Sequence, residues 1–412
     1  MKYDAVIAGA GPGGATAAAF MAEAGLRVLL VDKARFPRDK VCGDAISGKS
    51  VDVLRQLGLT RPLIDAGAQD AWGITFGAPS GEAASIPFTR DLDRAVPPTF
   101  VCRRDVFDQV VLDRALAAGA ELWDGTAVAG LLRDGDRITG VRLTAPGDAP
   151  KSSNRRLESP LVIGADGAYS AVVRGLGLPQ LAPRYYAAAV RAYYEGVTGF
   201  EDRPFMEIHF VDEALPGYFW IFPLGGGRAN VGVGMLSHAL KRSGKRLKAL
   251  LDVCVRHERF AGRFAHARRV GPVKGWGLPL GSRPRPMAGA GWLLLGDAAS
   301  LIDPFTGEGI GNAMVGGREA ARWAAAATAQ NDYSAAFLEG FERDMLGYLR
   351  SELRLSHAMQ RLTGWTALLD FVVRRAARSP EVADALSCMF DDEAQRRRLL
   401  SPLFYLRLLR PA

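Results

Sequence analysis

A glycine-rich turn between two apolar runs dominates the first 33 residues of the chain. The run 4–8 ends at Gly9-Ala-Gly-Pro-Gly-Gly14, an alanine-rich stretch follows, and the run 27–31 ends at Asp32. This order of strand, G-x-G-x-x-G turn, helix, strand and acidic residue is typical of a dinucleotide-binding βαβ unit. The sequence therefore predicts a Rossmann-type domain at its start.

Each glycine of this turn has an expected role. Gly9 is expected to make the tight turn, and Gly11 to let the backbone approach a pyrophosphate. Gly14 is expected to let the helix pack closely against the strand. The N-terminus of that helix then faces the phosphates. Asp32, 18 residues after Gly14, is expected to accept hydrogen bonds from a ribose. The motif by itself allows either NAD or FAD.

The composition is that of a globular protein with two or three domains. The 412 residues are 48% hydrophobic and 23% charged. No uncharged apolar run reaches the length of about 18 residues that a spanning helix needs. Asp4 stands where a signal peptide has basic residues, so we expect no targeting segment and a cytoplasmic location.

Cysteine and histidine usage argues against disulfides and metals. Cys42, Cys102, Cys254 and Cys388 are widely spaced and form no CxxC, which favours a reducing compartment. The five histidines do not cluster. We therefore expect no metal site.

The net charge of +8 is uneven, with five arginines and no acid after Glu393. A solvated basic surface explains this, and so does attraction to anionic lipid at the inner membrane face or to an acidic electron-donor protein. No nucleic-acid-binding motif accompanies the charge, so no nucleic-acid partner is expected.

Two further apolar runs end at acidic residues. Leu161-Val-Ile-Gly-Ala-Asp-Gly167 and Trp292-Leu-Leu-Leu-Gly-Asp297 read as buried strands that open into ligand-facing turns. After the second comes the glycine-rich loop 303–312, which leads into an alanine-rich helix. The amides at Gly309 and Ile310 are expected to lie at the N-terminus of that helix, where they can hold negative charge on a bound ring.

A second sheet is predicted from residue 181 onward. The stretches 186–194, 205–211, 217–222 and 228–235 have the character of successive strands, and the hairpin 71–88 is expected to join them. The fold class is therefore α/β (α+β overall), with a Rossmann-type domain, a mostly antiparallel substrate sheet and a helical C-terminal region. The expected ranges are 1–70, 97–180 and 270–330 for the first domain, 71–96 and 181–269 for the second, and 331–412 for the third.

Between these regions the sequence predicts smaller elements. A helix is expected at 105–118, a strand pair at 121–132 and 138–143, a polar loop at 146–158 and a basic helical insertion at 241–269. The C-terminal stretches 371–375 and 399–410 mix bulky apolar residues with arginine. These residues either cap the domains or contact a membrane interface.

Several side chains have two interpretations. Cys42 is either a small buried thiol or a group that borders a reactive ring, in the loop after Asp32. Arg104, or its neighbour Arg103, either reaches a phosphate or an adenine with its guanidinium or is a plain surface arginine. Alternating Tyr218, Trp220 and Phe222 share one face of a strand, either as core packing or as the wall of an apolar substrate pocket.

Taken together, the three turns resemble those of the FAD-dependent oxidoreductases of the aromatic-hydroxylase superfamily. They are the G-x-G-x-x-G of Gly9 to Gly14, the Asp166-Gly167 turn and Gly296-Asp297. Within that superfamily, Lys40-Val-Cys-Gly-Asp44 is similar to the Cys-Gly segment of the geranylgeranyl reductase family, and Tyr218-Phe-Trp-Ile-Phe-Pro223 matches its Y-x-W-x-F-P. The resemblance covers residues 1–330.

This resemblance implies an FAD-dependent oxidoreductase that transfers hydride from reduced flavin to C=C bonds of a polyprenyl chain on a lipid, quinone or pigment precursor. Tyr218, Trp220 and Phe222 would line the substrate tunnel, Cys42 would lie near the flavin, and no residue is identified as catalytic. Asp32 would bind the adenosine ribose, Arg104 the phosphate region and Asp297 the ribityl chain. The cofactor-binding set implied is Gly9, Gly11, Gly14, Asp32, Lys33, Cys42, Gly43, Arg104, Val128, Asp166, Asp297, Gly309 and Ile310.

One residue departs from the resemblance, and two other functions compete with it. Asp44 stands where family members often have a second glycine, which would change the polarity near the flavin. A flavin-dependent monooxygenase or halogenase acting on an aromatic natural product is the main alternative, and a flavin-bound sensor is a non-enzymatic one. No second G-x-G-x-x-G domain is visible, so NAD(P)H and a ferredoxin-type protein both remain candidates for the electron donor.

Overall fold

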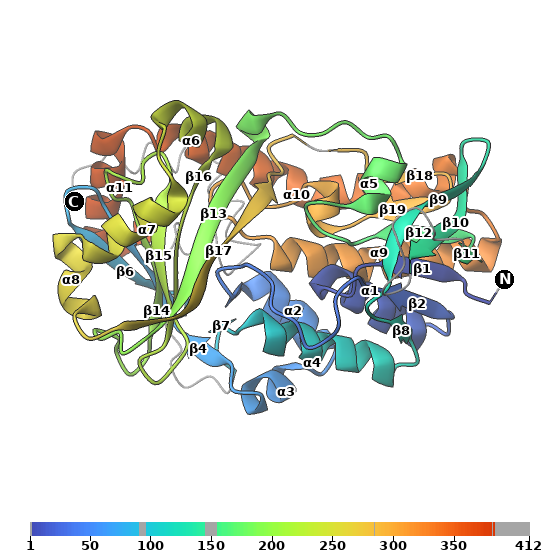
Figure 1. The fold of residues 1–412 in the computed structure, drawn as a ribbon, viewed down its shortest axis with the longest axis horizontal. Helices are drawn as coiled ribbons and strands as arrows, with labels where there is room; N and C mark the ends of the chain where they lie inside the picture. The colour runs from blue at the N-terminus through green and yellow to red at the C-terminus, as the bar shows by residue number, and fades with distance from the viewer. Residues whose placement is uncertain (1, 90–95, 145–154, 284, 381, 384–412) are drawn as a thin grey trace.

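Two large sheets form the two halves of the molecule in the computed structural model, which describes residues 2–89, 96–144, 155–283, 285–380 and 382–383 (Figure 1). One half holds a six-stranded, mostly parallel sheet near the N-terminus, and the other holds a seven-stranded, mostly antiparallel sheet. The predicted α/β class with a Rossmann-type domain and a second antiparallel sheet is confirmed.

The six-stranded sheet contains the predicted βαβ unit. Its strands lie in the order β18-β19-β12-β1-β2-β8, and all neighbouring pairs are parallel except β18 with β19. The strands β1, β2 and β12 are buried along their whole length, as their unbroken apolar sequences predict. The bounds are β1 Ala5–Ala8, β2 Val28–Val31, β8 Glu121–Trp123, β12 Leu161–Gly164, β18 Ala288–Gly289 and β19 Trp292–Leu294.

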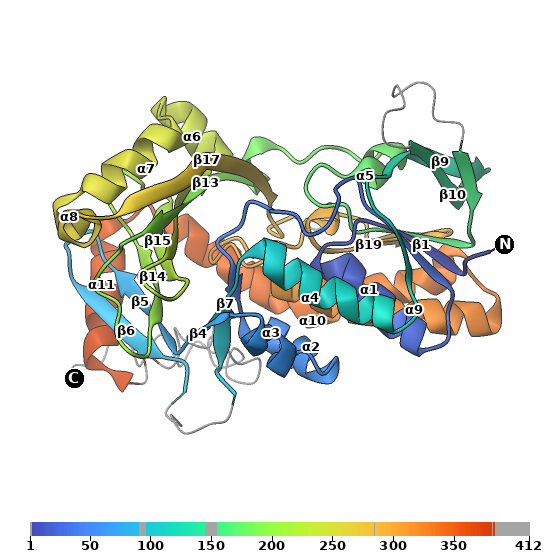
Figure 2. The same cartoon turned by 60° about the horizontal axis from the view of Figure 1, so that its bottom comes forward.

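Four helices pack around this sheet, and α4 lies beside α1 (Figure 2). They are α1 (Pro12–Glu23), α4 (Arg104–Ala117), α9 (Ile310–Gln330) and α10 (Ala335–Leu362). Small residues explain how closely α1 approaches α9. A Cβ atom on Gly317 would lie 2.5 Å from the Gly13 carbonyl oxygen, so only glycine allows that contact. The alanine-rich sequences of both helices therefore bring two helix N-termini to one edge of the sheet.

Two three-stranded sheets flank the first half, and they correct two predictions. The expected strand 121–132 is divided into β8, which extends the parallel sheet, and β9, which pairs with β10. The expected loop 146–158 ends in a strand, β11, and residues 145–154 before that strand lie outside the described residues. The bounds are β9 Ala127–Asp134, β10 Arg137–Thr144 and β11 Arg155–Glu158 in one sheet, and β3 Ala45–Ile46, β4 Gln69–Ala71 and β7 Thr99–Val101 in the other.

The seven-stranded sheet has the order β17-β13-β16-β15-β14-β5-β6. The predicted hairpin joins it through β14 and β5, which pair in parallel, and the other pairs are antiparallel. Strand β17 crosses the predicted domain boundary at residue 270 because it pairs with β13 along its length. The bounds are β5 Gly73–Gly77, β6 Ala83–Pro87, β13 Tyr186–Glu195, β14 Phe205–His209, β15 Tyr218–Pro223, β16 Ala229–Leu236 and β17 Arg268–Pro279.

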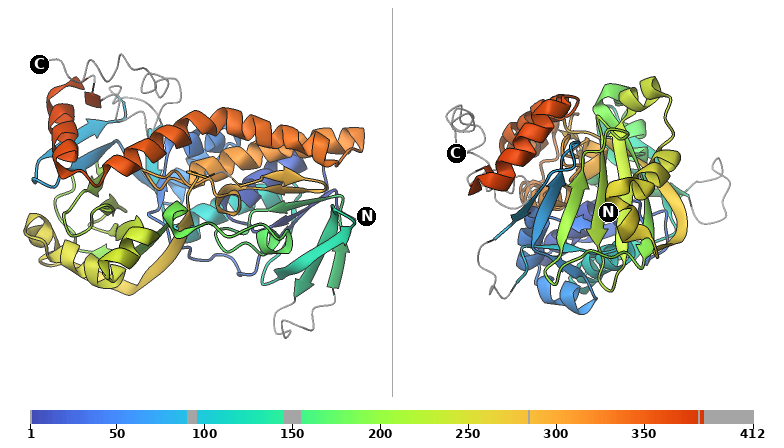
Figure 3. Two further views of the ribbon diagram at one scale, coloured as in Figure 1. Left: turned by 90° about the horizontal axis from the view of Figure 1, so that it is seen from above. Right: turned by 90° about the vertical axis from the view of Figure 1, so that its left-hand side faces the viewer.

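The remaining helices are short, apart from those near the C-terminus. Helix α10 runs from the first half of the molecule to the second, and α11 packs on β6 (Figure 3). The remaining bounds are α2 Gly48–Gln56, α3 Thr60–Asp65, α5 Ala171–Gly175, α6 Ser237–Ser243, α7 Leu247–Arg256, α8 Glu258–Phe264, α11 Thr366–Arg378, and the 3-10 helices Pro183–Tyr185 and Gly296–Ala299. The predicted contact at 399–410 lies outside the described residues. Among those that are described, no helix is both long and apolar enough to cross a bilayer.

Candidate active site

A single continuous cavity of about 600 Å³ joins the carboxyl ends of β1, β2 and β12 to the inner face of the seven-stranded sheet. In open α/β sheets ligands bind beyond the carboxyl ends of the strands, so this edge is the expected place for a cofactor. Every cofactor and substrate residue predicted from the sequence lines the cavity except Gly14.

The glycine turn at the first end of the cavity is fixed by sterics. Gly9 has φ +98°, and a Cβ atom there would lie 2.4 Å from the Ala165 carbonyl oxygen. A Cβ atom on Gly14 would lie 1.9 Å from the Gly9 oxygen, which explains why Gly14 packs behind the turn and does not line the cavity. Gly11 is the N-cap of α1, and no side chain caps that helix. The first amides of α1 are therefore available to an anionic ligand.

A shared carboxylate holds two guanidinium groups beside this helix N-terminus. Arg104 donates to Asp108 over 2.6 and 2.9 Å, and Arg38 lies 2.6 Å from the same carboxylate. Burial lowers the pKa of Arg104, but Asp108 and Cys42 outweigh that effect and raise it above its ordinary value. Arg103 instead lies at the surface, where it pairs with Asp105. The structure therefore brings Arg104, and not Arg103, to the cavity.

Two of the predicted acidic residues hold the backbone around the cavity. The Asp32 carboxylate accepts the Ala10 and Ala34 amides, each at 2.8 Å. The Asp166 carboxylate accepts the amides of Ala171, at 2.6 Å, and Val172, at 3.3 Å, at the start of α5. Burial raises the pKa of Asp166. Both residues line the cavity, as do Lys33 and Val128 near Asp32.

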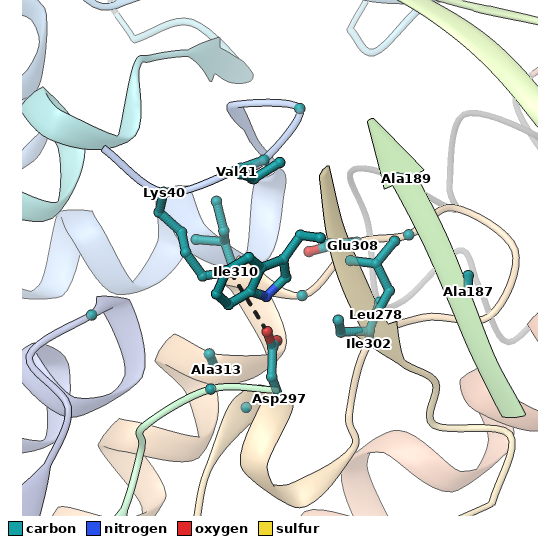
Figure 4. Close-up of a pocket in the computed structure, with 18 of the residues that line it drawn as sticks. Lys40, Val41, Ala187, Ala189, Leu278, Asp297, Ile302, Glu308, Ile310 and Ala313 are labelled. Carbon is teal, nitrogen blue, oxygen red and sulfur yellow. Dashed lines mark ion pairs between the residues drawn. The ribbon is translucent and has the colours of Figure 1, made fainter. Parts of the chain in front are cut away.

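At the middle of the cavity, Lys40 extends from one wall toward Asp297 on the other (Figure 4). The Lys40 ammonium lies 4.0 Å from the Asp297 carboxylate and 4.4 Å from the centre of the Trp276 ring. Burial lowers the pKa of Lys40, although Asp297 opposes that effect. Ile310, also in this view, begins α9, whose N-cap Gly309 has no side-chain cap. A second helix N-terminus therefore opens into the cavity.

The other end of the cavity is apolar and aromatic. Tyr218, Trp220 and Phe222 of β15 line it, so these side chains are pocket wall as well as core. The indole of Trp220 lies over Gly232 of the neighbouring strand, where a Cβ atom would come within 2.1 Å of the ring. Tyr218 donates to the Thr306 carbonyl oxygen over 2.7 Å, and burial raises its pKa. Further apolar wall at this end includes Met206, Ile208, Phe210, Pro216 and Phe305.

The loop with Cys42 lies between the two ends. Cys42 is half-buried and lines the cavity together with Gly43, whose Cβ position is 3.0 Å from the Phe222 ring. The Asp44 side chain is not part of the cavity wall, since it hydrogen-bonds Tyr193 and Asn230. The polarity change expected from Asp44 is therefore absent from the cavity surface.

Known proteins are similar in sequence to this chain. The family described as FAD binding domain matches residues 2–344. A menaquinone reductase of Mycobacterium tuberculosis is 35% identical over 330 residues, which cover 77% of this chain and 75% of the relative. Digeranylgeranylglycerophospholipid reductase 2 of Methanopyrus kandleri is 34% identical over 352 residues, covering 83% and 82%.

Solved structures of similar proteins have the same fold as this chain. A geranylgeranyl bacteriochlorophyll reductase-like protein from Thermoplasma acidophilum matches with a TM-score of 0.82 at 25% identity, over 97% of this chain and 98% of that one. The chain belongs to the geranylgeranyl reductase family of FAD-dependent oxidoreductases. A flavin-dependent brominase matches with a TM-score of 0.76 at 23% identity, which is a likeness of fold.

The residues of this reductase-family chain fit FAD, the cofactor of the family. Two uncapped helix N-termini, at α1 and α9, and the buried guanidinium of Arg104 suit the anionic parts of a dinucleotide. The carboxylates of Asp32 and Asp297 border the same cavity and can accept hydrogen bonds from hydroxyl groups. In the described part of the chain, no three His, Cys, Asp or Glu side chains group so as to hold a metal ion.

Sequence reasoning missed several cavity residues of this oxidoreductase. Arg38 and Trp276 carry no motif, and only the fold brings them to the cavity wall. Gln360 and Thr363, from the end of α10, also reach it, where they donate to the Pro304 and Pro216 carbonyl oxygens. Lys40 could have been noticed, because it begins the segment that resembles the family's Cys-Gly motif.

Proposed function

We propose that the protein saturates C=C bonds of a polyprenyl chain carried by a lipid, quinone or pigment precursor. The supporting observation is that one cavity joins the FAD half to an apolar, aromatic-walled half. A flexible isoprenoid chain has no polar groups to satisfy, so it suits walls made of Trp220, Phe222 and Ile208. The relatives named above reduce a menaquinone and a digeranylgeranyl lipid, as their names state.

The chemistry assigns separate tasks to the cofactor and the chain. Bound FAD, once reduced, supplies the hydride, and the alkene carbon pair gains this hydride and one proton. The chain's residues bind and orient the alkene and exclude water, with the Cys42 loop packed against Trp220 and Phe222 in the cavity wall. The nicotinamide dinucleotide NAD(P)H or a ferredoxin-type protein is proposed to provide the electrons.

The reaction can be tested in a single turnover. Dithionite-reduced, FAD-loaded protein, freed of excess dithionite, is mixed anaerobically with a geranylgeranyl lipid. With a menaquinone, whose ring also takes two electrons from reduced flavin, only the mass gained after air reoxidation of the ring is counted. We expect the flavin absorbance to return and the product to gain two mass units per double bond, because each bond takes up two hydrogen atoms. Mass spectrometry and the flavin spectrum measure both changes together.

One outcome would contradict the proposal and another would favour a different function. The proposal is contradicted if none of several polyprenyl substrates reoxidises the flavin. Oxygen-dependent substrate modification, or bromide incorporation into an aromatic compound, would favour the monooxygenase or halogenase that the shared fold allows. The Ile208→Trp variant serves as a control, because a larger ring in the apolar half should slow reoxidation by the polyprenyl substrate and leave reoxidation by oxygen unchanged.

We also propose that the corner between α10 and α11 contacts an anionic membrane surface. Leu362, Trp365 and Phe371 are 41%, 67% and 42% exposed there, next to exposed Arg361. Exposed aromatic and basic side chains together suit a lipid interface. Thr363, in the same turn, lines the apolar end of the cavity, so a lipid-borne chain would have a short path to the pocket.

Vesicle co-sedimentation tests this contact. The Leu362→Ser/Trp365→Ser double variant is expected to lose most of its binding to vesicles that contain phosphatidylglycerol, because two exposed apolar anchors are removed. Val253→Ser is the matched control, since Val253 is 46% exposed on α7, away from the corner. Equal binding by the double variant and the unmodified protein would contradict the proposal.

A further inference from the structure

Asp44 is a carboxylate buried behind the Cys42 loop. Its side chain is fully buried, and its backbone lies in the left-handed region at φ +68°. Glycine adopts this conformation most readily, and a side chain there carries a conformational cost. The backbone of Asp44 also anchors the loop, because the Asp44 carbonyl oxygen accepts a hydrogen bond from the Cys102 amide at 2.9 Å. A buried acid in a conformation that favours glycine calls for a structural role.

One asparagine connects this carboxylate to the aromatic wall. Asn230 of β16 is fully buried, and its Nδ2 donates to Asp44 Oδ2 and to the Cys42 carbonyl oxygen, each over 2.8 Å. Its Oδ1 accepts the indole Nε1–H of Trp220 at 3.0 Å. Turning the amide over would place its NH₂ group against the indole donor, so the network fixes a single orientation.

A second donor completes the network. The Tyr193 hydroxyl on β13 donates to the same Asp44 Oδ2 over 2.8 Å. Arg191, Arg104 and Arg103 are charged neighbours that interact with Asp44, and the Asp44 carboxylate in turn acts on the Cys102 thiol. The loop between the two halves is thus tied to two strands of the substrate sheet, through the buried side chains of Asp44 and Asn230 and the partly buried Tyr193.

We propose that Asp44 and Asn230 are positioning residues that clamp the Cys42 loop to Trp220 and thereby set the shape of the apolar pocket. Cys42, Gly43 and Trp220 all line that pocket, and a Cβ atom on Gly43 would lie 3.7 Å from the Trp220 indole nitrogen, so the loop packs directly beside the indole. The clamp joins the loop to the strand through hydrogen bonds of defined length. In a pocket that holds a flexible chain, this shape would decide which double bond lies beside the flavin; this last step rests on the proposed function.

The clamp can be tested without any substrate, through the reactivity of Cys42. Cys42 is half-buried, whereas Cys102 and Cys254 are buried, and mass spectrometry of the peptides assigns the label to each cysteine. In the full-length FAD-loaded protein, iodoacetamide should label Cys42 about tenfold faster in Asp44→Gly and in Asn230→Ala, because loss of two buried hydrogen bonds favours loop opening. Asp44→Asn keeps the acceptor oxygen and should label within about twofold of the unmodified protein.

The variants are matched so that two other causes of faster Cys42 labelling, glycine flexibility and a lost charge, are recognised. Asn230→Ala alters no loop residue, so its agreement with Asp44→Gly would exclude the added flexibility of glycine as the cause. Asp65→Asn, an exposed carboxylate on α3, is the control for a lost charge. Unchanged labelling in Asp44→Gly, or equally fast labelling in Asp44→Asn, would overturn the clamp.

A second measurement addresses specificity. With a polyprenyl substrate, Asp44→Gly should shift the ratio of partially to fully reduced products and raise KM more than it lowers kcat, and Asp44→Asn should restore both. Absence of turnover in the unmodified protein would refute the proposed function and leave the labelling result as the test of the clamp. Identical product ratios in all variants would overturn the role in specificity.

Discussion

Replacing Gly11 by valine is expected to abolish FAD binding while the apoprotein stays folded. Gly11 has φ −73°, a value open to every residue, and the nearest atom to its Cβ position is the mobile end of Arg38 at 3.4 Å. The valine would instead occupy the cavity in front of the uncapped N-terminus of α1. We expect affinity for FAD to fall by at least about 100-fold, or about 3 kcal/mol.

The flavin content of the purified protein and reconstitution with FAD measure this effect. Gly347→Val is the matched control, because Gly347 is exposed on α10 with no atom within 4 Å of its Cβ position. Gly14→Ala should behave differently and lose the fold, since its Cβ would lie 1.9 Å from the Gly9 oxygen. A Gly11→Val protein that retains one FAD per chain would contradict the assignment of the phosphate site.

Asparagine in place of Asp44 is expected to stabilise the protein more as the pH rises. Burial raises the pKa of Asp44 from 3.8 to about 7, although Asn230 and Tyr193 donate hydrogen bonds to it and Arg191 lies nearby. Between these two values the folded state holds a proton that the unfolded state has lost. Stability of the unmodified protein therefore falls as the pH rises through this window and then levels off above it.

Asparagine at position 44 has no such titration. The gain in unfolding free energy from Asp44→Asn should therefore be larger at about pH 8 than at about pH 5, by an amount on the order of 3 kcal/mol. Urea unfolding of both proteins at the two pH values measures the difference, and Asp65→Asn at the surface should show little of it. A gain that does not change with pH would show that the Asp44 carboxyl is already ionised in the folded protein.

The turns at the strand ends were predictable because their chemistry is local. A Cβ atom on Gly14 would lie 1.9 Å from the Gly9 oxygen, a steric demand set within five residues, and Asp166 and Asp297 follow two and three residues after buried strands. The choice between Arg103 and Arg104 was not local, since it depends on which guanidinium the fold turns toward the cavity, where the distant Arg38 shares Asp108 with Arg104. Strand β17 was missed because Lys241 to Arg269 is basic and the stretch that follows carries little apolar alternation.

The dinucleotide-binding unit, the second sheet and the aromatic strand were predictable from the residues alone, because backbone sterics and apolar periodicity act over short distances along the chain. What those pieces enclose depends on the tertiary structure. It turned Asp44 away from the cavity toward Asn230, and it carried Thr363 to the pocket from the far end of α10. These contacts join residues far apart in the chain, and they form only when sheets and helices bury their apolar faces against one another.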